Sequence, residues 1–178
     1  NNIAIETMNQ TLGGAFTARV NMNLREDKGW AYGAYTFLQD ARGQRPFMVY
    51  APVQTDKTGA SLLELKKELN SYLGDKPPMP DELERARLDQ VRSLPGQYET
   101  STAVLGSLLS SSRFNRPYNY PETLVEQYNA LTLDDLENAA AQVVMPGKLT
   151  WLIICDAEKL FDGTTIKSDC EAKKHIYN

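Results

Sequence analysis

The segment from Leu12 to Phe37 constrains the fold more than any other part of this sequence, because its periodicity changes from helical to extended within a few residues. Two adjacent glycines, Gly13 and Gly14, favour a bend and tolerate positive φ, so they predict a break after a first helix. That first helix carries an apolar stripe at helical spacing, made of Ile5, Met8 and Leu12.

A second helix is predicted directly after the glycines. Thr17 is placed to cap its start, and Gly29 is placed to end it in a left-handed conformation after Lys28. One face of this helix is predicted to be apolar, with residues four apart: Phe16, Val20 and Leu24.

From Trp30 the period becomes two, as in a strand. Tyr32, Ala34 and Thr36 are predicted to share one face of it. Because Arg25 falls in the last turn of the helix, this cation and the Tyr32 phenol could converge on one edge of a sheet. Gly33 has no side chain with which to shield Tyr32.

The order L-G-G, A-R-V and L-R-E-D-K-G-W-A-Y resembles the carboxy-terminal domain of the insulinase, pitrilysin and mitochondrial processing peptidase family, the inverzincin zinc peptidases. The resemblance runs from Ile3 to Ala157 and includes S-L-P-G-Q-Y-E-T, which is similar to a helix-breaking segment of the family. In that family an Arg and a Tyr spaced like Arg25 and Tyr32 reach into the active site that the other, zinc-bearing domain forms.

The resemblance implies that Arg25 and Tyr32 are catalytic and that both, with Gly33, contact substrate. Tyr32 would hydrogen-bond near the scissile carbonyl and Arg25 would hold the substrate main chain, interactions that help most in the transition state. The residues alone also allow a structural role, in which Arg25 pairs with Glu26 or Asp27 and Tyr32 packs at a sheet edge. The flanking glycines and the K-G-x-x-Y pattern favour the functional interpretation.

The remaining chain predicts a partner strand over 46–53, several helices between 58 and 144, and a strand over 148–155 that is buried on both faces. Within the helix over 98–111, a buried stripe is expected from Leu105, Leu108 and Leu109. This order indicates an α+β fold, a mostly antiparallel sheet with helices packed on one face. We expect one peptidase-type domain over 1–157 that lacks its first strand, as in a fragment of a longer polypeptide, and leave the polar tail 158–178 unassigned.

Zinc peptidases of this kind need an H-x-x-E-H helix, but the only histidine in this chain is His175. Cys155 and Cys170 lack metal-ligand spacing. We therefore expect no metal bound by this segment, which would be inactive alone, and zinc in an insulinase-type partner domain of the same chain or another subunit. A net charge of −4 argues against nucleic acid, and no apolar run reaches membrane length.

The function expected from these observations is that of the substrate-binding half of a zinc metalloendopeptidase, which encloses peptides or unfolded segments in a chamber. The alternatives are a non-catalytic subunit or structural core protein of the same fold, and a free-standing α+β interaction module. The compartment is not determined by the residues; the habit of the family favours the bacterial periplasm.

Overall fold

The computed structural model describes residues 2–154 of the chain. Its regular elements are, in order, α1 (Asn2–Asn9), the π-helix η1 (Gln10–Gly14), α2 (Arg19–Asn21), the π-helix η2 (Met22–Asp27), β1 (Tyr35–Leu38), β2 (Phe47–Tyr50), η3 (Thr55–Lys57), α3 (Thr58–Leu73), α4 (Pro80–Ser93), η4 (Pro95–Tyr98), α5 (Ser101–Arg113), α6 (Tyr120–Asn129), α7 (Leu133–Val143) and η5 (Pro146–Lys148).

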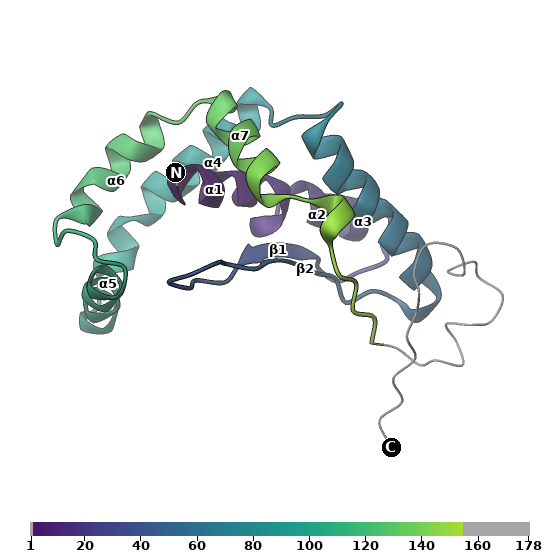
Figure 1. Ribbon diagram of the computed structural model, residues 1–178, viewed down its shortest axis with the longest axis horizontal. Helices are drawn as coiled ribbons and strands as arrows, with labels where there is room; N and C mark the ends of the chain where they lie inside the picture. The colour runs from purple at the N-terminus through teal and green to yellow at the C-terminus, as the bar shows by residue number, and fades with distance from the viewer. Residues whose placement is uncertain (1, 155–178) are drawn as a thin grey trace, which may run out of the picture.

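The helices form an arch over one face of a β-hairpin (Figure 1). Strands β1 and β2 pair antiparallel, with Tyr35 opposite Tyr50 and Leu38 opposite Phe47. Helix α1 lies between the hairpin and α7, α4 packs beside α1, and α3 contacts α2 and α7. The antiparallel pairing is therefore confirmed, but the described residues are mostly helical and contain only this small two-stranded sheet.

The core is an apolar cluster shared by α1, α3 and α7, at the centre of the arch. Met8 and Leu12 are fully buried, which confirms that the first helix turns its stripe inward. Leu69 and Leu136 meet this stripe from α3 and α7 and are also fully buried. Burial of the apolar side chains of this cluster is the main favourable contribution to the free energy of folding.

The break predicted after the first helix is present, but it starts at Ala15: the helix widens into η1, whose last residues are Gly13 and Gly14, and neither glycine has positive φ. Their role is close packing. A Cβ at Gly13 would lie 2.5 Å from Thr36 Oγ1 and 2.7 Å from Thr36 N, and one at Gly14 would lie 2.7 Å from Asn9 Nδ2. Among residues 2–154, Gly29 is the glycine with positive φ, at +65°, and so ends the second helix as predicted.

Three further sequence predictions, at separate places in the chain, are wrong. Ala18 rather than Thr17 precedes α2 as its N-cap. The leucines of α5 face outward, with Leu109 60% exposed, and small and serine side chains of α5 face the domain instead. Residues 149–154 form no strand, and Leu152 and Ile154 are 84% and 90% exposed.

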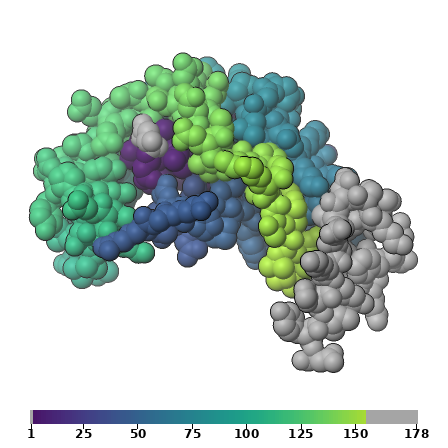
Figure 2. Space-filling model, in the orientation of Figure 1, coloured from purple at the N-terminus to yellow at the C-terminus, as the bar shows by residue number. Residues whose placement is uncertain are grey.

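Residues 149–154 do not form a central strand, because neither β1 nor β2 pairs with them. An extended backbone needs a neighbouring strand for its hydrogen bonds. In Figure 2 this segment (yellow-green) runs along the surface on the side of the molecule opposite the green α5–α6 arm. The assignments of the tail 158–178, His175, Cys155 and Cys170 lie outside the described residues.

Candidate functional site

The site is built where η2 ends and the chain turns back toward β1. Arg25 lies on η2, a π-helix in which the N–H of Lys28 donates to the carbonyl of Asn23, five residues earlier, at 3.0 Å. A π-helical turn is wider than an α-turn and therefore aims its side chains differently. The 3.6-residue period predicted for this segment accordingly placed Arg25 in the last turn but could not give its direction.

The reversal after η2 is held by backbone hydrogen bonds. The Leu24 carbonyl accepts from Trp30 N at 2.9 Å and from Ala31 N at 3.3 Å, so the chain folds back tightly over the helix end. From the other side, Gln54 N donates to the Trp30 carbonyl at 2.9 Å and Gln54 Nε2 donates to the Gly29 carbonyl at 3.2 Å. These bonds return the chain toward Arg25 just before Tyr32.

A bulge then directs Tyr32 outward. Ala31 forms a bridge with Val53 and Tyr35 pairs with Tyr50, so that three residues, 32–34, face two, 51–52. The extra residue breaks the period of two. Ala34 and Thr36 are buried as neighbours on one face, whereas Tyr32 is 86% exposed and does not share it, contrary to the sequence prediction.

Gly33, within the bulge, has a packing role that the sequence did not reveal. A Cβ there would lie 2.5 Å from the Tyr35 hydroxyl oxygen, so glycine lets the Tyr35 phenol approach the backbone. Tyr32 is left uncovered beside it.

The structure brings Arg25 and Tyr32 together, with the Arg25 Cζ over the Tyr32 ring at 5.0 Å from its centroid. The same guanidinium lies 4.4 Å from the centroid of Phe16 and is ion-paired through Nε to Glu26 Oε1 at 3.1 Å. Cation–π contact of this kind favours a fixed guanidinium position. Of the structural role that the residues also allow, the pair between Arg25 and Glu26 forms, whereas Tyr32 stays exposed.

Phe16 is the site residue that sequence reasoning missed. It was predicted on the apolar face of the second helix, but it precedes that helix and its side chain is 53% exposed. The signal for Phe16 in the sequence is its position: it is an aromatic residue that comes just after Gly13 and Gly14 and before the helix that carries Arg25.

Asn21 is fully buried, and its side chain holds the backbone on both sides of this site. Its Nδ2 donates to the Phe16 carbonyl at 2.6 Å, and its Oδ1 accepts from Ala34 N at 3.0 Å. A polar residue three positions before Leu24, inside an apolar stripe, was the signal for such a role, since buried amides need partners.

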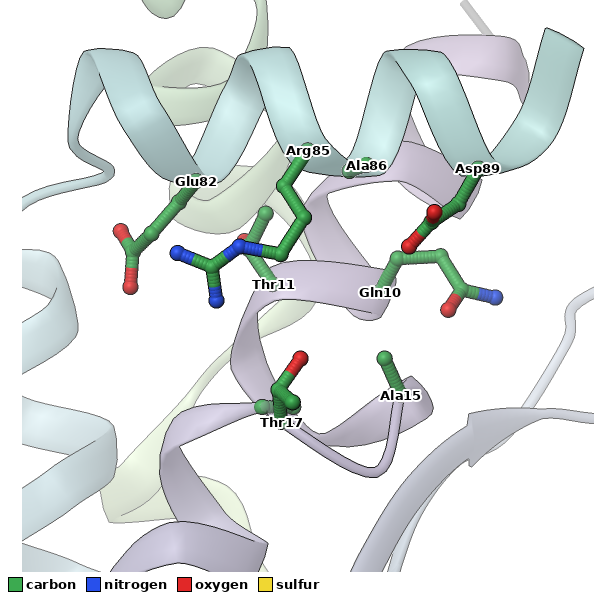
Figure 3. A pocket seen from close by; sticks show the side chains of 9 residues that line it. Gln10, Thr11, Ala15, Thr17, Glu82, Arg85, Ala86 and Asp89 are labelled. Carbon is green, nitrogen blue, oxygen red and sulfur yellow. The ribbon is translucent and has the colours of Figure 1, made fainter. Parts of the chain in front are cut away.

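The hollows found elsewhere in the domain do not include Arg25 or Tyr32. The one in Figure 3, between α4 and the η1 turn, measures about 20 Å³, room for roughly one water molecule, and is lined by charged side chains such as Arg85 and Asp89. A larger cavity of about 380 Å³ lies between α1, α4, α5 and α6. Burial raises the pKa of Glu6 at its edge and raises the pKa of Tyr128 to about 12.

Within residues 2–154, no group of three or more His, Cys, Asp or Glu side chains is arranged to hold a metal ion. In the same part of the chain, no helix combines the length and apolar character that crossing a membrane requires. What the site offers chemically is an exposed phenol and a fixed guanidinium, which are hydrogen-bond donors for a carbonyl or carboxylate oxygen.

Comparison with protein families places this geometry in context. Residues 1–88 match the family model described as the peptidase M16 inactive domain. A search of curated proteins gave no match.

Solved structures extend the likeness. The peptidase M16 inactive domain from Pseudomonas fluorescens is 26% identical with a TM-score of 0.71 over 82% of this chain and 34% of that one. A protease from Helicobacter pylori is 16% identical, with a TM-score of 0.66 over 79% of this chain and 33% of that one. The periplasmic protease PqqL from Escherichia coli is 16% identical, with a TM-score of 0.63 over 79% and 15%. This chain thus spans about a third or less of each.

Proposed function

Because residues 1–88 of this chain belong to the peptidase M16 inactive-domain family, we propose that the chain is the substrate-binding half of a zinc metalloendopeptidase. In this proposal a separate insulinase-type domain, in the same polypeptide or another subunit, holds zinc with an H-x-x-E-H helix. The two halves enclose a peptide or an unfolded segment, and this half has no hydrolytic activity alone.

The observation that carries the proposal is the convergence of Arg25 and Tyr32. Their side chains come from a π-helix and a β-bulge, and they meet with Cζ 5.0 Å from the ring centroid. Both of these irregularities are enriched near active sites, where they re-aim side chains. An exposed tyrosine that only packed at a sheet edge would not need either.

The proposed chemistry divides between the two halves. Zinc, when bound by the facing domain, supplies the activated water and polarises the scissile carbonyl. From this chain, the Tyr32 hydroxyl donates a hydrogen bond to the carbonyl oxygen as negative charge develops there. Arg25 donates from its terminal nitrogens to a neighbouring main-chain carbonyl, and Gly33 lets the peptide backbone approach.

Tyr32→Phe in the complete peptidase tests the proposal. Removing one donor from a developing oxyanion costs roughly 100-fold or more in kcat, so we expect peptide cleavage to fall by about that factor. Zinc content, measured by elemental analysis, and assembly with the zinc-bearing half, measured by size-exclusion chromatography, should stay unchanged. Tyr118→Phe, which removes the hydroxyl of another exposed tyrosine, serves as the matched control.

Unchanged turnover in Tyr32→Phe would contradict the assigned role of Tyr32. If the native assembly contained no zinc and no H-x-x-E-H partner, the alternative of a non-catalytic subunit of the same fold would replace the proposal. Intact mass and zinc content of the protein from its native source decide between these two.

A further inference from the structure

We propose that Phe16 is a specificity-determining residue, which together with Tyr32 contacts a large apolar side chain of the bound peptide next to the bond to be cleaved. This inference rests on the proposed function and adds to it the class of peptide that the site prefers. It concerns an exposed aromatic pair, defined here as Phe16 and Tyr32, bridged by the Arg25 guanidinium.

The first argument is the arrangement of the pair. Arg25 Cζ lies 4.4 Å from the Phe16 centroid and 5.0 Å from the Tyr32 centroid, so one cation joins two rings. Phe16 is 53% exposed and Tyr32 86%. A single exposed aromatic ring is ordinary on a protein surface, but here two exposed rings lie near one another, each beside the same hydrogen-bond donor.

The second argument is rigidity, because Phe16 is held by a buried group. Asn21 has no exposed surface, and its amide ties the Phe16 carbonyl to the N–H of Ala34, two residues after Tyr32. One side chain thus sets the backbone under both rings. Holding two surface rings in register through a buried amide is the arrangement expected for a preorganised contact.

The third argument is that Arg25 has hydrogen-bond donors available for a ligand. Nε is ion-paired with Glu26, and the guanidinium lies over the two rings. Within residues 2–154, the terminal nitrogens of Arg25 donate no hydrogen bond, so they are the donors available to a peptide carbonyl. A residue whose carbonyl binds Arg25 would place its side chain near the aromatic pair, which favours aromatic or large aliphatic side chains.

The test compares two peptides that differ only in Phe or Ala at one residue next to the cleaved bond, measured as kcat/KM with the complete peptidase. We expect the native protein to prefer the Phe peptide and Phe16→Ala to reduce that preference by about 10-fold or more, since a pocket contact of this size is worth 10-fold to 200-fold. Phe16→Leu should keep most of the preference. Leu63→Ala, which truncates an exposed apolar residue of α3, should leave it unchanged.

The ratio of the two kcat/KM values separates the outcomes. If Phe16→Ala lowers both values equally, Phe16 only supports Arg25 and the inference is overturned. If the ratio is unchanged while Tyr32→Phe inactivates the enzyme, the inference fails and the proposed function survives. If Tyr32→Phe is also without effect, the proposed function fails with it.

Discussion

Replacing Gly13 with alanine should destabilise this domain strongly, although alanine is the better helix former. The added Cβ would lie 2.5 Å from Thr36 Oγ1 and 2.7 Å from the Thr36 backbone nitrogen. Thr36 cannot easily withdraw, because it is buried and bonded twice to Asn9. Its Oγ1 donates to Asn9 Oδ1 at 2.8 Å, and its carbonyl accepts from Asn9 Nδ2 at 3.1 Å.

The expected magnitude follows from three contributions. Overpacking a filled site costs about 3 kcal/mol at the upper end of its usual range, which applies because one clashing atom is backbone. Loss or distortion of one Asn9–Thr36 hydrogen bond costs about 1 kcal/mol. The helix propensity of alanine over glycine returns about 1 kcal/mol. The net loss of about 3 kcal/mol lowers Tm by about 6–12 °C for a domain of this size.

The assay is thermal and urea unfolding followed by circular dichroism, with Gly106→Ala as the matched control. Gly106 lies within α5 and a Cβ there meets no atom within 4 Å. The same substitution should therefore stabilise the protein at that position by up to about 1 kcal/mol. Equal effects of the two substitutions, or a neutral Gly13→Ala, would refute the close contact of η1 with β1.

Two further stability predictions concern buried polar groups. Asn21→Ala should lower the free energy of unfolding by about 2–4 kcal/mol, because it leaves two backbone groups without their partner. The control, Asn70→Ala, loses one exposed hydrogen bond to the Lys66 carbonyl and should cost less than about 1 kcal/mol. Equal losses in urea unfolding would contradict the role of Asn21. Glu6→Gln should raise Tm at pH 7 and leave it unchanged near pH 3, because burial raises the pKa of Glu6 above the ordinary value of a glutamate side chain. The folded state therefore binds the proton more tightly, and the native protein loses stability as pH rises from the unfolded to the folded pKa of Glu6. A lower Tm for Glu6→Gln than for the native protein at pH 7 would contradict this prediction.

Much of the fold was predictable from local chemistry. A capping box of Thr132 and Asp135, which the sequence shows as T-x-x-D, opens α7, with the Asp135 N–H bonded to Thr132 Oγ1 at 3.2 Å. Pro80 occupies the first turn of α4, where its missing N–H has no cost. Gly29 supplies the one left-handed glycine found in the described residues. Each of these signals acts within one turn of chain and needs no contact from a distant segment.

Burial was harder to predict where it depends on the neighbour. The leucines of α5 have the same spacing as a buried stripe, yet Leu105 and Leu109 are exposed because other faces of α5 meet the domain. Likewise, the apolar run that ends in Leu152 and Ile154 looked like a central strand but has no strand beside it among residues 2–154. Periodicity gives the faces of an element but not what covers them.

By itself, the sequence determined the helix-to-strand change around Gly29 and the choice of Arg25 and Tyr32 as candidate site residues. It also gave the family resemblance, which the match over residues 1–88 confirms. Only the tertiary structure decided how these residues are presented. The π-helical turn and the bulge each shift side-chain direction by inserting one residue into a regular repeat, and they are stabilised by contacts from distant segments. Phe16 and Asn21 joined the site for the same reason, since their partners lie on elements that only folding brings together.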